Sequence, residues 1–189
     1  MGLIIRPMEQ GVWAEMLEIY YQGIQTNMAT FENECPTSEE WDKTHTVDCR
    51  LVAEDDCEVV GFAVLSPVST REVFKGVVEL HIYVDVDHKR MGVGEMLLNA
   101  IVEESDKSGY WAVMANVLEE NVAALGLFEK CGFRRVGKLE RTGKDRFGVW
   151  RSLVIYEHRI QSDIAGGCDC DLVKNGGAEP GSVFYEENK

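Results

Sequence analysis

Apolar side chains recur along the first 160 residues with two spacings, the period of two that is typical of strands and the period of three to four that is typical of helices. The clearest period of two runs over Val77–Val84, and it predicts a strand that presents Glu79, His81 and Tyr83 on one face. Further strands are predicted at residues 3–6, 50–54, 59–65, 111–117, 134–139 and 150–158. The short polar segment between the second and third of these indicates a hairpin.

Helical spacing separates these strands at four places. Apolar positions predict a first helix over about residues 11–26 and a third helix over about residues 92–107. Ser38 is a candidate N-cap for a short second helix, and Asn121 is a candidate N-cap for a fourth helix that ends before Gly132. Mixed strands with helices between them indicate an α/β (α+β) fold in which helices cover both faces of a central sheet.

Composition divides the chain at about residue 160. Residues 1–160 are long enough for one domain with its own core, whereas residues 161–189 are rich in Gly and acidic residues and are expected to form a mobile tail. The chain has 189 residues, with 19 Lys and Arg against 33 Asp and Glu, which gives a net charge of −14. This negative charge argues against general binding of nucleic acid.

The cysteines and the apolar segments bear on the compartment. Six cysteines are scattered along the chain, which favours free thiols in a reducing cytoplasm. Cys168 and Cys170 lack the second pair of ligands that a zinc site needs, so no metal is expected. No apolar segment is long enough to span a bilayer, and Arg6 interrupts the apolar start, so we expect neither a membrane segment nor a signal peptide.

A basic segment with two glycines follows the Val77–Val84 strand. It reads Lys89-Arg90-Met91-Gly92-Val93-Gly94. Glycines let the backbone approach a ligand closely, and the free N–H groups at a helix start bind phosphate oxygens. The segment therefore predicts a site for a phosphorylated cofactor, although taken alone it also suits an ordinary turn before a helix.

Two other phosphate-binding motifs are excluded. The dinucleotide fingerprint needs a glycine three residues after Gly94, where this chain has Leu97. A P-loop at residues 132–138 would need Ser or Thr next, where this chain has Leu139.

The order of motifs after the basic segment is more specific than the segment itself. Lys89-x-x-Gly92-x-Gly94 is followed by a helix, a strand, Asn121 and a helix that ends at Phe128–Phe133. Over about residues 3–160 this order resembles the GNAT superfamily of acetyl-CoA-dependent N-acetyltransferases. The resemblance implies a GNAT fold, a mixed, mostly antiparallel, twisted sheet flanked by about four helices.

Four further places are similar to one group in that superfamily, the phosphinothricin and methionine-sulfone acetyltransferases. These are Thr30-Phe31-Glu32, Arg71 with Phe74, Glu79-x-x-x-Tyr83-Val84 and Phe147-Gly148-Val149-Trp150. The resemblance implies an enzyme that acetylates a small amino-acid-like amine.

Acetyl-CoA is the acetyl donor that the resemblance implies. Its pyrophosphate is expected to bind the Lys89 and Arg90 side chains and the backbone of Met91, Gly92, Val93 and Gly94. Asn121 is expected to bind the pantetheine arm as well as to cap its helix. Backbone groups of Tyr83 and Val84 are expected to polarise the thioester.

Glu79 is the candidate general base, since it matches the catalytic carboxylate of the family. Acetyl transfer to an amine needs such a base because an amine with a pKa of about 10.4 is mostly protonated at neutral pH. His81 is a second candidate base, because the ordinary pKa of histidine suits neutral pH. A purely structural role for His81 is equally open.

The acceptor site is expected to include Phe31, Glu32, Arg71 and Phe74. A guanidinium suits a carboxylate or phosphinate, which favours a role for Arg71 in binding an acidic group. Two residues depart from the family pattern. Phe128 replaces the usual Tyr or His and is expected only to pack in the core, and Ser152 replaces an Asp. Trp150 is expected in the core.

The sequence thus favours a cytoplasmic, metal-free N-acetyltransferase for a small amine, working as a homodimer without nucleic-acid or membrane partners. Acetyl transfer would occur directly in a ternary complex. Two alternatives stay open, acetylation of a protein N-terminus or another amine, and a catalytically idle protein that binds acyl-CoA.

Overall fold

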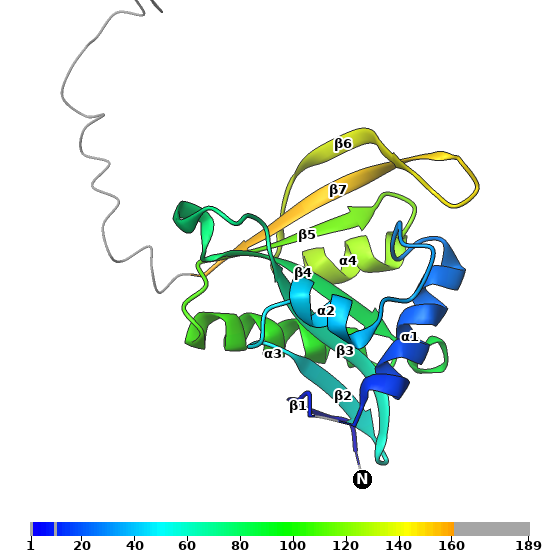
Figure 1. The fold of residues 1–189 in the computed structure, drawn as a ribbon, viewed down its shortest axis with the longest axis vertical. Coiled ribbons are helices and arrows are strands. Elements are labelled where there is room, and N and C mark those ends of the chain that lie inside the picture. The colour runs from blue at the N-terminus through cyan, green and yellow to red at the C-terminus, as the bar shows by residue number, and fades with distance from the viewer. Residues whose placement is uncertain (1, 10, 161–189) are drawn as a thin grey trace, which may run out of the picture.

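A seven-stranded sheet forms the centre of the molecule (Figure 1). The structure is a computed structural model that describes residues 2–9 and 11–160, so the predicted tail at 161–189 lies outside the described residues. The strands follow the order β1-β2-β3-β4-β5-β7-β6 across the sheet. Their bounds are β1 Ile4–Pro7, β2 Leu51–Asp55, β3 Glu58–Pro67, β4 Val77–Val84, β5 Ala112–Leu118, β6 Arg134–Lys144 and β7 Trp150–Arg159.

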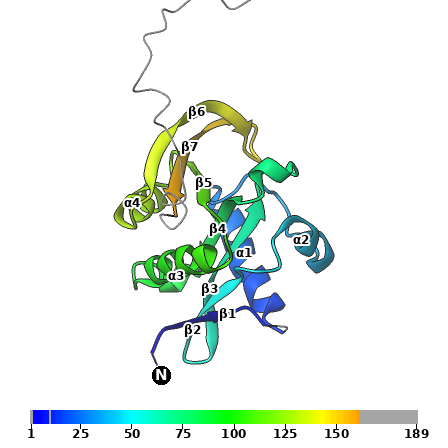
Figure 2. The ribbon, with the colours of Figure 1, turned by 90° about the vertical axis from the view of Figure 1, so that its left-hand side faces the viewer.

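Four helices cover the two faces of this sheet. They are α1 Trp13–Thr26, α2 Ser38–Thr44, α3 Val93–Lys107 and α4 Val122–Lys130, and two short 3₁₀ turns, η1 Glu72–Phe74 and η2 Val86–His88, flank β4. Helices α1 and α2 lie on one side of the sheet and α3 and α4 on the other (Figures 1 and 2). The mixed sheet and its four helices confirm the predicted fold class.

The alternation of apolar side chains along the strands gives two separate cores. Val52, Phe62 and Val64 pack with α1 and α2 in one core, whereas Ala53 and Leu65 pack with α3 and α4 in the other. Successive residues of a strand point to opposite faces, so a sheet covered on both sides needs apolar residues at both parities. This requirement explains the continuous apolar run along β3.

One strand pair differs from all the others. β4 and β5 are parallel, whereas the remaining neighbours are antiparallel. The parallel ladder begins at Val77 with Ala112 and ends at Glu79 with Met114, although β4 continues to Val84. The two strands therefore diverge beyond Glu79, and the backbone of β4 on that side has no β5 partner there.

Three local predictions need correction. Thr37, not Ser38, caps α2: its side chain accepts a hydrogen bond from the Glu40 backbone N–H, and the Glu40 carboxylate accepts one from the Thr37 N–H. β6 extends to Lys144, five residues beyond the predicted end, because a register shift after Leu139 lets pairing with β7 resume at Gly143. The shift hides the continuation from a simple period of two.

The third correction concerns Trp150, which was expected in the core. Its side chain is 52% exposed at the start of β7. The Lys144 amino group lies 5.0 Å from the centre of its ring.

No helix among the described residues combines the length and the apolar character needed to cross a membrane. Within the same residues, no group of three or more His, Cys, Asp or Glu side chains is placed to hold a metal ion.

Candidate active site

A cleft opens between the end of β4 and α4, beyond the positions at which β4 pairs with β5. Its volume is about 620 Å³. We call it the inter-strand cleft. Its walls include Ile82, Tyr83 and Val84 of β4, the segment with Lys89, Arg90, Gly92 and Gly94, Met28 and Ala29 after α1, and Asn121, Leu127 and Phe128 near α4. The cleft thus brings together the basic segment and the β4 residues that the sequence singled out.

The basic segment forms an anion-binding turn at one end of the cleft. Arg90 and Gly92 have positive φ angles of 63° and 89°, and α3 begins directly afterwards at Val93. The first backbone N–H groups of a helix have no partner within the helix, and its N-terminus carries partial positive charge. Together with the Lys89 and Arg90 side chains, these groups can bind phosphate.

Met91, Val93 and Gly94 can contribute to the anion site only through their backbone or, for Gly94, through its small size. Val93 is 2% exposed and packs in the core, and the Met91 side chain is 59% exposed and does not line the cleft. A Cβ atom on Gly94 would lie 2.9 Å from Cδ2 of Leu127, so glycine lets the start of α3 approach α4 closely.

Asn121 has the capping role that the sequence predicted, and it also lines the cleft. Its side-chain oxygen accepts a hydrogen bond of 3.1 Å from the Ala124 N–H, which confirms it as the cap of α4. Its amide also donates to the Met28 carbonyl at 3.1 Å, and the residue lines the inter-strand cleft. The amide ties the α4 start to the segment after α1 across the cleft.

Glu79 stands at the last position where β4 pairs with β5. Its carboxylate accepts a hydrogen bond of 2.9 Å from the Asn116 amide on β5. A small cavity of about 80 Å³ lies there, between the diverging strands, and we call it the connecting cavity. Its lining includes Glu79, His81, Tyr83, Asn116, Asn121 and Phe128. A carboxylate held beside this space can take a proton from a group that enters it.

His81 lies two residues further along the same face of β4. Its Nε2 is 2.8 Å from the Ser66 hydroxyl, and burial lowers its pKa to about 4. The His45 ring meets it edge-on at 5.2 Å, and burial lowers the pKa of His45 also to about 4. Desolvation disfavours the charged imidazolium, so both rings are neutral at pH 7.

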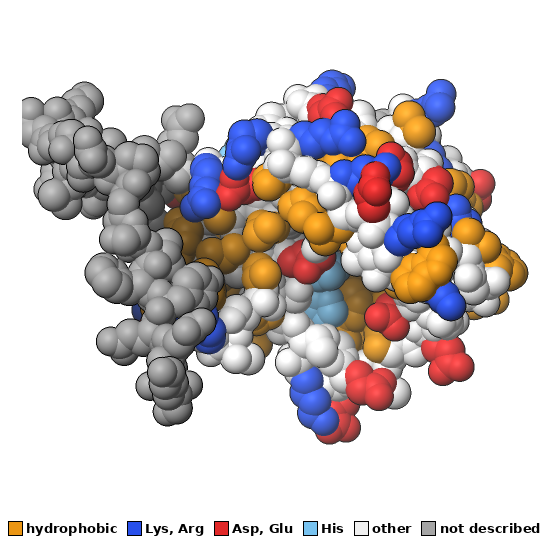
Figure 3. All heavy atoms as spheres, turned by 90° about the horizontal axis from the view of Figure 1, so that it is seen from above, with side chains coloured by type: hydrophobic (Ala, Val, Ile, Leu, Met, Phe, Trp, Pro, Cys, Tyr) orange, Lys and Arg blue, Asp and Glu red, His pale blue; other side chains and the backbone are white. Residues whose placement is uncertain are grey.

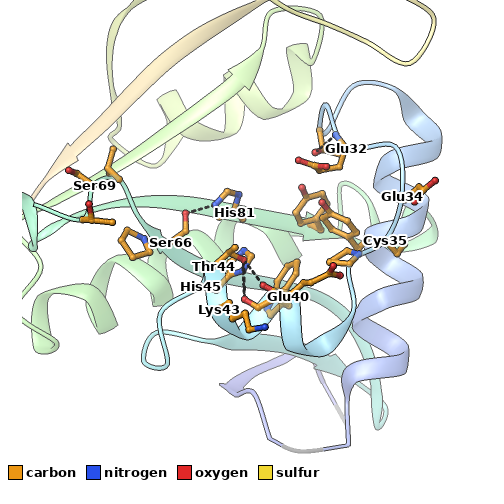
Figure 4. A pocket seen from close by; sticks show the side chains of 18 residues that line it. Glu32, Glu34, Cys35, Glu40, Lys43, Thr44, His45, Ser66, Ser69 and His81 are labelled. Atoms are coloured by element: carbon orange, nitrogen blue, oxygen red, sulfur yellow. Dashed lines mark hydrogen bonds between the residues drawn. The ribbon is translucent and has the colours of Figure 1, made fainter.

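A third cavity, of about 1060 Å³, is larger than the other two described here and lies on the α1 and α2 side of the sheet (Figure 4). We call it the α2 cavity. Figure 4 shows His45 and His81 close together on its wall, with Ser66 beside His81. The lining includes Tyr20, Glu32, Glu34, Cys35, Glu40, Thr44, His45, Ser66, Thr70, His81 and Tyr83. His81 and Tyr83 also line the connecting cavity, so the two spaces share one wall on β4.

The four predicted acceptor residues occupy different surroundings. Glu32 lines the α2 cavity. Phe31 instead packs against β6, since a Cβ on Gly143 would lie 3.0 Å from its ring. Arg71 and Phe74 stand on the exposed segment around η1, where the guanidinium carbon lies 5.3 Å from the Phe74 ring centre. Neither residue lines the three cavities described here.

Phe128 has the packing role that the sequence indicated. It is 2% exposed, with its ring 5.0 Å from that of Phe133 and 5.6 Å from that of Tyr156. An apolar ring that also lines the cleft can exclude water, but it cannot donate a proton. The site therefore has no acid at this position.

Sequence reasoning missed three polar residues of the site. Asn116 had a visible signal, because it is a lone amide in the apolar strand Ala112–Leu118. Ser66 and His45 had none, since each reaches His81 only through the folding of distant segments. Tyr83 was predicted, and its burial against Tyr20 raises its pKa, so its phenol stays protonated.

Two enzymes are similar to this chain in sequence. The L-methionine sulfoximine/L-methionine sulfone acetyltransferase of Pseudomonas paraeruginosa is 33% identical over 108 residues, which are 57% of this chain and 62% of that enzyme. The phosphinothricin N-acetyltransferase of Streptomyces viridochromogenes is 28% identical over 161 residues, 83% of this chain and 87% of that enzyme.

A solved structure shares the fold. The phosphinothricin acetyltransferase of Sinorhizobium meliloti, in complex with AcCoA, superposes with a TM-score of 0.77 at 23% identity, over 85% of this chain and 89% of that chain. Residues 13–133 match the model of the acetyltransferase (GNAT) family. Since this match spans more than half of the sequence, the chain belongs to the acetyltransferase (GNAT) family.

Proposed function

We propose that this protein transfers an acetyl group from acetyl-CoA to the amine of a small amino-acid-like acceptor, of the phosphinothricin or methionine-sulfone type. The observation that carries the proposal is the divergence of β4 and β5, with a basic helix start in the inter-strand cleft and Glu79 in the connecting cavity beside it. The relatives named above act on acceptors of this type.

The inter-strand cleft fits acetyl-CoA in shape and chemistry. The turn with Lys89 and Arg90 suits the pyrophosphate. The unpaired edge of β4 beyond Glu79 offers backbone groups to the amides of the pantetheine arm, much as an added strand would pair. Asn121 can bind the same arm from the opposite wall. When bound, acetyl-CoA supplies a thioester carbonyl that an amine can attack.

Glu79 takes the proton of the acceptor amine in this proposal. A positioned base contributes about 10²–10⁴-fold to the rate. The hydrogen bond from Asn116 fixes the carboxylate beside the connecting cavity. His81 instead has its Nε2 engaged at 2.8 Å by the Ser66 hydroxyl, away from Asn116 and Glu79. We therefore give His81, with Ser66, the role of positioning the acceptor.

The leaving group needs no acid. A free thiol has a pKa of about 8.5, so its thiolate leaves at neutral pH without strong assistance. Phe128 offers no proton, and direct transfer in a ternary complex requires none from that position. No covalent acetyl-enzyme is part of the proposal.

The α2 cavity is the acceptor site in this proposal. It shares the wall formed by His81 and Tyr83 with the connecting cavity, which Glu79 lines, so an acceptor that extends past this wall brings its amine to Glu79. Glu32 lines the cavity and can bind the ammonium form of the acceptor. Arg71 is one residue beyond Thr70 of the lining and remains the candidate for an acceptor carboxylate.

We also propose a cytoplasmic homodimer that needs neither metal nor nucleic acid. The four cysteines of the described residues are free thiols, which suits a reducing compartment. The homodimer rests on resemblance to the family.

A thiol-release assay tests the proposed activity. The purified protein is mixed with acetyl-CoA and one acceptor at a time, namely phosphinothricin, methionine sulfone, other amino acids, polyamines and short peptides. We expect saturable release of thiol with the first two acceptors. Tight binding of acetyl-CoA without release for any acceptor would instead make the protein an idle binder, and release with peptides alone would make it a peptide acetyltransferase.

A further inference from the structure

The hairpin of β6 and β7 has a charge opposite to that of the rest of the molecule. Residues 134–151 contain seven Lys or Arg residues against two acidic ones, a net charge of +5, so the remainder of the chain carries −19. Basic side chains gather on the upper face of the molecule, over this hairpin (Figure 3). Such a local excess of one sign favours binding of the other sign.

Three of these cations, Arg141, Lys144 and Arg146, lie at the end of the hairpin and have no ion pair with a carboxylate among the described residues. The same end exposes apolar side chains, with Phe147 69% and Trp150 52% exposed. Lys144 lies over the Trp150 ring and Arg146 over the Phe147 ring, at 5.0 Å in both cases. We call residues 141–150 the hairpin tip.

The hairpin tip is held in one shape by Asp145. One carboxylate oxygen accepts hydrogen bonds of 2.9 Å from the backbone N–H groups of Phe147 and Val149. The other accepts from the Asn27 amide at 2.9 Å and from Arg151 at 2.8 Å. These donors hold the pKa of Asp145 well below its usual range. A surface that is already ordered loses less entropy when it binds a partner.

We propose that the hairpin tip binds the end of this same chain, the segment Val183-Phe184-Tyr185-Glu186-Glu187. Residues 161–182 contain no aromatic side chain, so within 161–189 the two aromatic residues stand only here, next to two carboxylates. Phe184 and Tyr185 complement the exposed rings of the tip, and Glu186 and Glu187 complement its unpaired cations.

The length of the intervening chain suits this contact. The tip lies at one end of β7, and residue 161 follows the other end, separated by the ten residues of Trp150–Arg159, or about 33 Å of strand. The 22 residues 161–182 have a maximum reach of about 73 Å, so their length allows the segment 183–187 to meet the tip. Because both partners belong to one chain, their effective concentration exceeds that of separate molecules.

The contact would place the segment next to the proposed acceptor site. Asp145 is bonded to Asn27, the Arg146 guanidinium reaches the Gln25 side chain at 3.4 Å, and Gly143 packs against Phe31. The following residues of that loop line both main cavities, with Met28 and Ala29 in one and Thr30 and Glu32 in the other. A segment bound at the tip therefore lies beside the loop through which substrates would enter the two cavities.

Zero-length cross-linking of the full chain tests the proposal. A carbodiimide joins a lysine amine to a carboxylate only at contact distance, and mass spectrometry identifies the pair. We expect Lys144 to link preferentially to Glu186 or Glu187. An equal mixture of ¹⁴N- and ¹⁵N-labelled protein distinguishes links within one chain from links between copies. Replacing Phe184 and Tyr185 by Ala, or adding 1 M NaCl, should lower the yield several-fold.

The matched control is Glu179→Gln. It removes a carboxylate that precedes the binding segment 183–187, so it should leave the link intact. Links between labelled and unlabelled copies only would show that a second copy binds the tip. Links spread evenly from Glu186 over exposed lysines such as Lys75 and Lys130 would show random collision. No link at Lys144, or either of these results, overturns the proposal.

Discussion

At the scale of single residues, two ionisable side chains on one face of β4, Glu79 and His81, have different surroundings. Glu79 ends the parallel ladder and keeps an oriented carboxylate beside Asn116. His81, two residues later, is buried against Ser66 with a pKa lowered to about 4. The period of two puts both on one face, but their hydrogen-bond partners differ, since Asn116 orients the Glu79 carboxylate and Ser66 engages the His81 ring.

Acid should destabilise the protein through His81. In the unfolded chain the pKa is about 6.5, so from pH 6.5 down to about 4 the unfolded state binds a proton that the folded state does not. The contribution to stability is therefore complete above pH 6.5 and is lost as pH falls through this window. Each pKa unit corresponds to about 1.36 kcal/mol, which limits the loss to roughly 3 kcal/mol.

Urea unfolding between pH 7 and pH 4.5 measures this effect. The variant His81→Gln keeps a partner for Ser66 and cannot titrate in this range. We expect the wild-type free energy of unfolding to fall by about 1–3 kcal/mol more than that of the variant over the same interval. Parallel pH profiles for the two proteins would mean that His81 is protonated in the folded state.

Lys89 and Arg90 should determine affinity for acetyl-CoA. Reversing both charges, as Lys89→Glu with Arg90→Glu, puts like charges beside the pyrophosphate. We expect the Kd for acetyl-CoA to rise by at least about tenfold, or 1.4 kcal/mol. Isothermal titration calorimetry gives the value, and Lys75→Glu, an exposed cation paired with Glu72 far from the cleft, is the control. Unchanged affinity in the double variant would remove the proposed pyrophosphate site.

At the scale of secondary-structure elements, the site depends on how strands and helices end. The cleft exists because β4 and β5 pair over three positions and then separate, while α3 and α4 begin at its two sides. The α2 cavity depends in the same way on α2, which ends at Thr44 and carries His45 directly after it. Capping of α2 therefore bears on the acceptor site.

Loss of the α2 cap should be measurable. Thr37→Ala removes the hydrogen bond to the Glu40 N–H and one partner of the Glu40 carboxylate. Removal of an N-cap costs about 0.5–2 kcal/mol, so we expect a lower denaturation midpoint by that amount. Ser38→Ala is the matched control at the neighbouring position and should cost much less. A larger loss of stability from Ser38→Ala than from Thr37→Ala would show that Ser38 is the cap, as the sequence first indicated.

At the scale of the whole molecule, the sequence predicts the architecture well because most elements are defined by local patterns. The β4 alternation, the basic turn and Asn121 were identified correctly, since each is a short-range signal. The long extent of β6 and the exposure of Trp150 could not be seen, because they depend on a register shift and on which strands a helix covers.

The candidate site could be predicted only in part for the same reason. Alternation along one strand puts Glu79 and Tyr83 on one face and the family resemblance singles them out, whereas the partners of the site residues come from other strands and from the end of α2. Asn116 approaches Glu79 across β5, and Ser66 approaches His81 from β3. Such contacts depend on strand order and register, which a single sequence does not contain.

The domain boundary gives a test at this scale. A chain that ends at Gln161 keeps every described strand, both cores and the lining of all three cavities. We expect it to fold and to bind acetyl-CoA with the Kd of the full chain, because it keeps every cleft residue that the structure describes. Circular dichroism and calorimetry check both properties. Failure to fold would show that residues 161–189 belong to the domain.

The measurement that tests the account most directly is the pH dependence of kcat/KM for Glu79→Gln, with the Kd for acetyl-CoA determined alongside. Glutamine keeps the shape of the side chain and a partner for Asn116 but cannot accept a proton. We predict that kcat/KM falls by about 10²–10⁴-fold at neutral pH, that the deficit shrinks as pH rises, and that the Kd stays unchanged. Full activity in the variant would contradict the account, as would loss of acetyl-CoA binding together with activity.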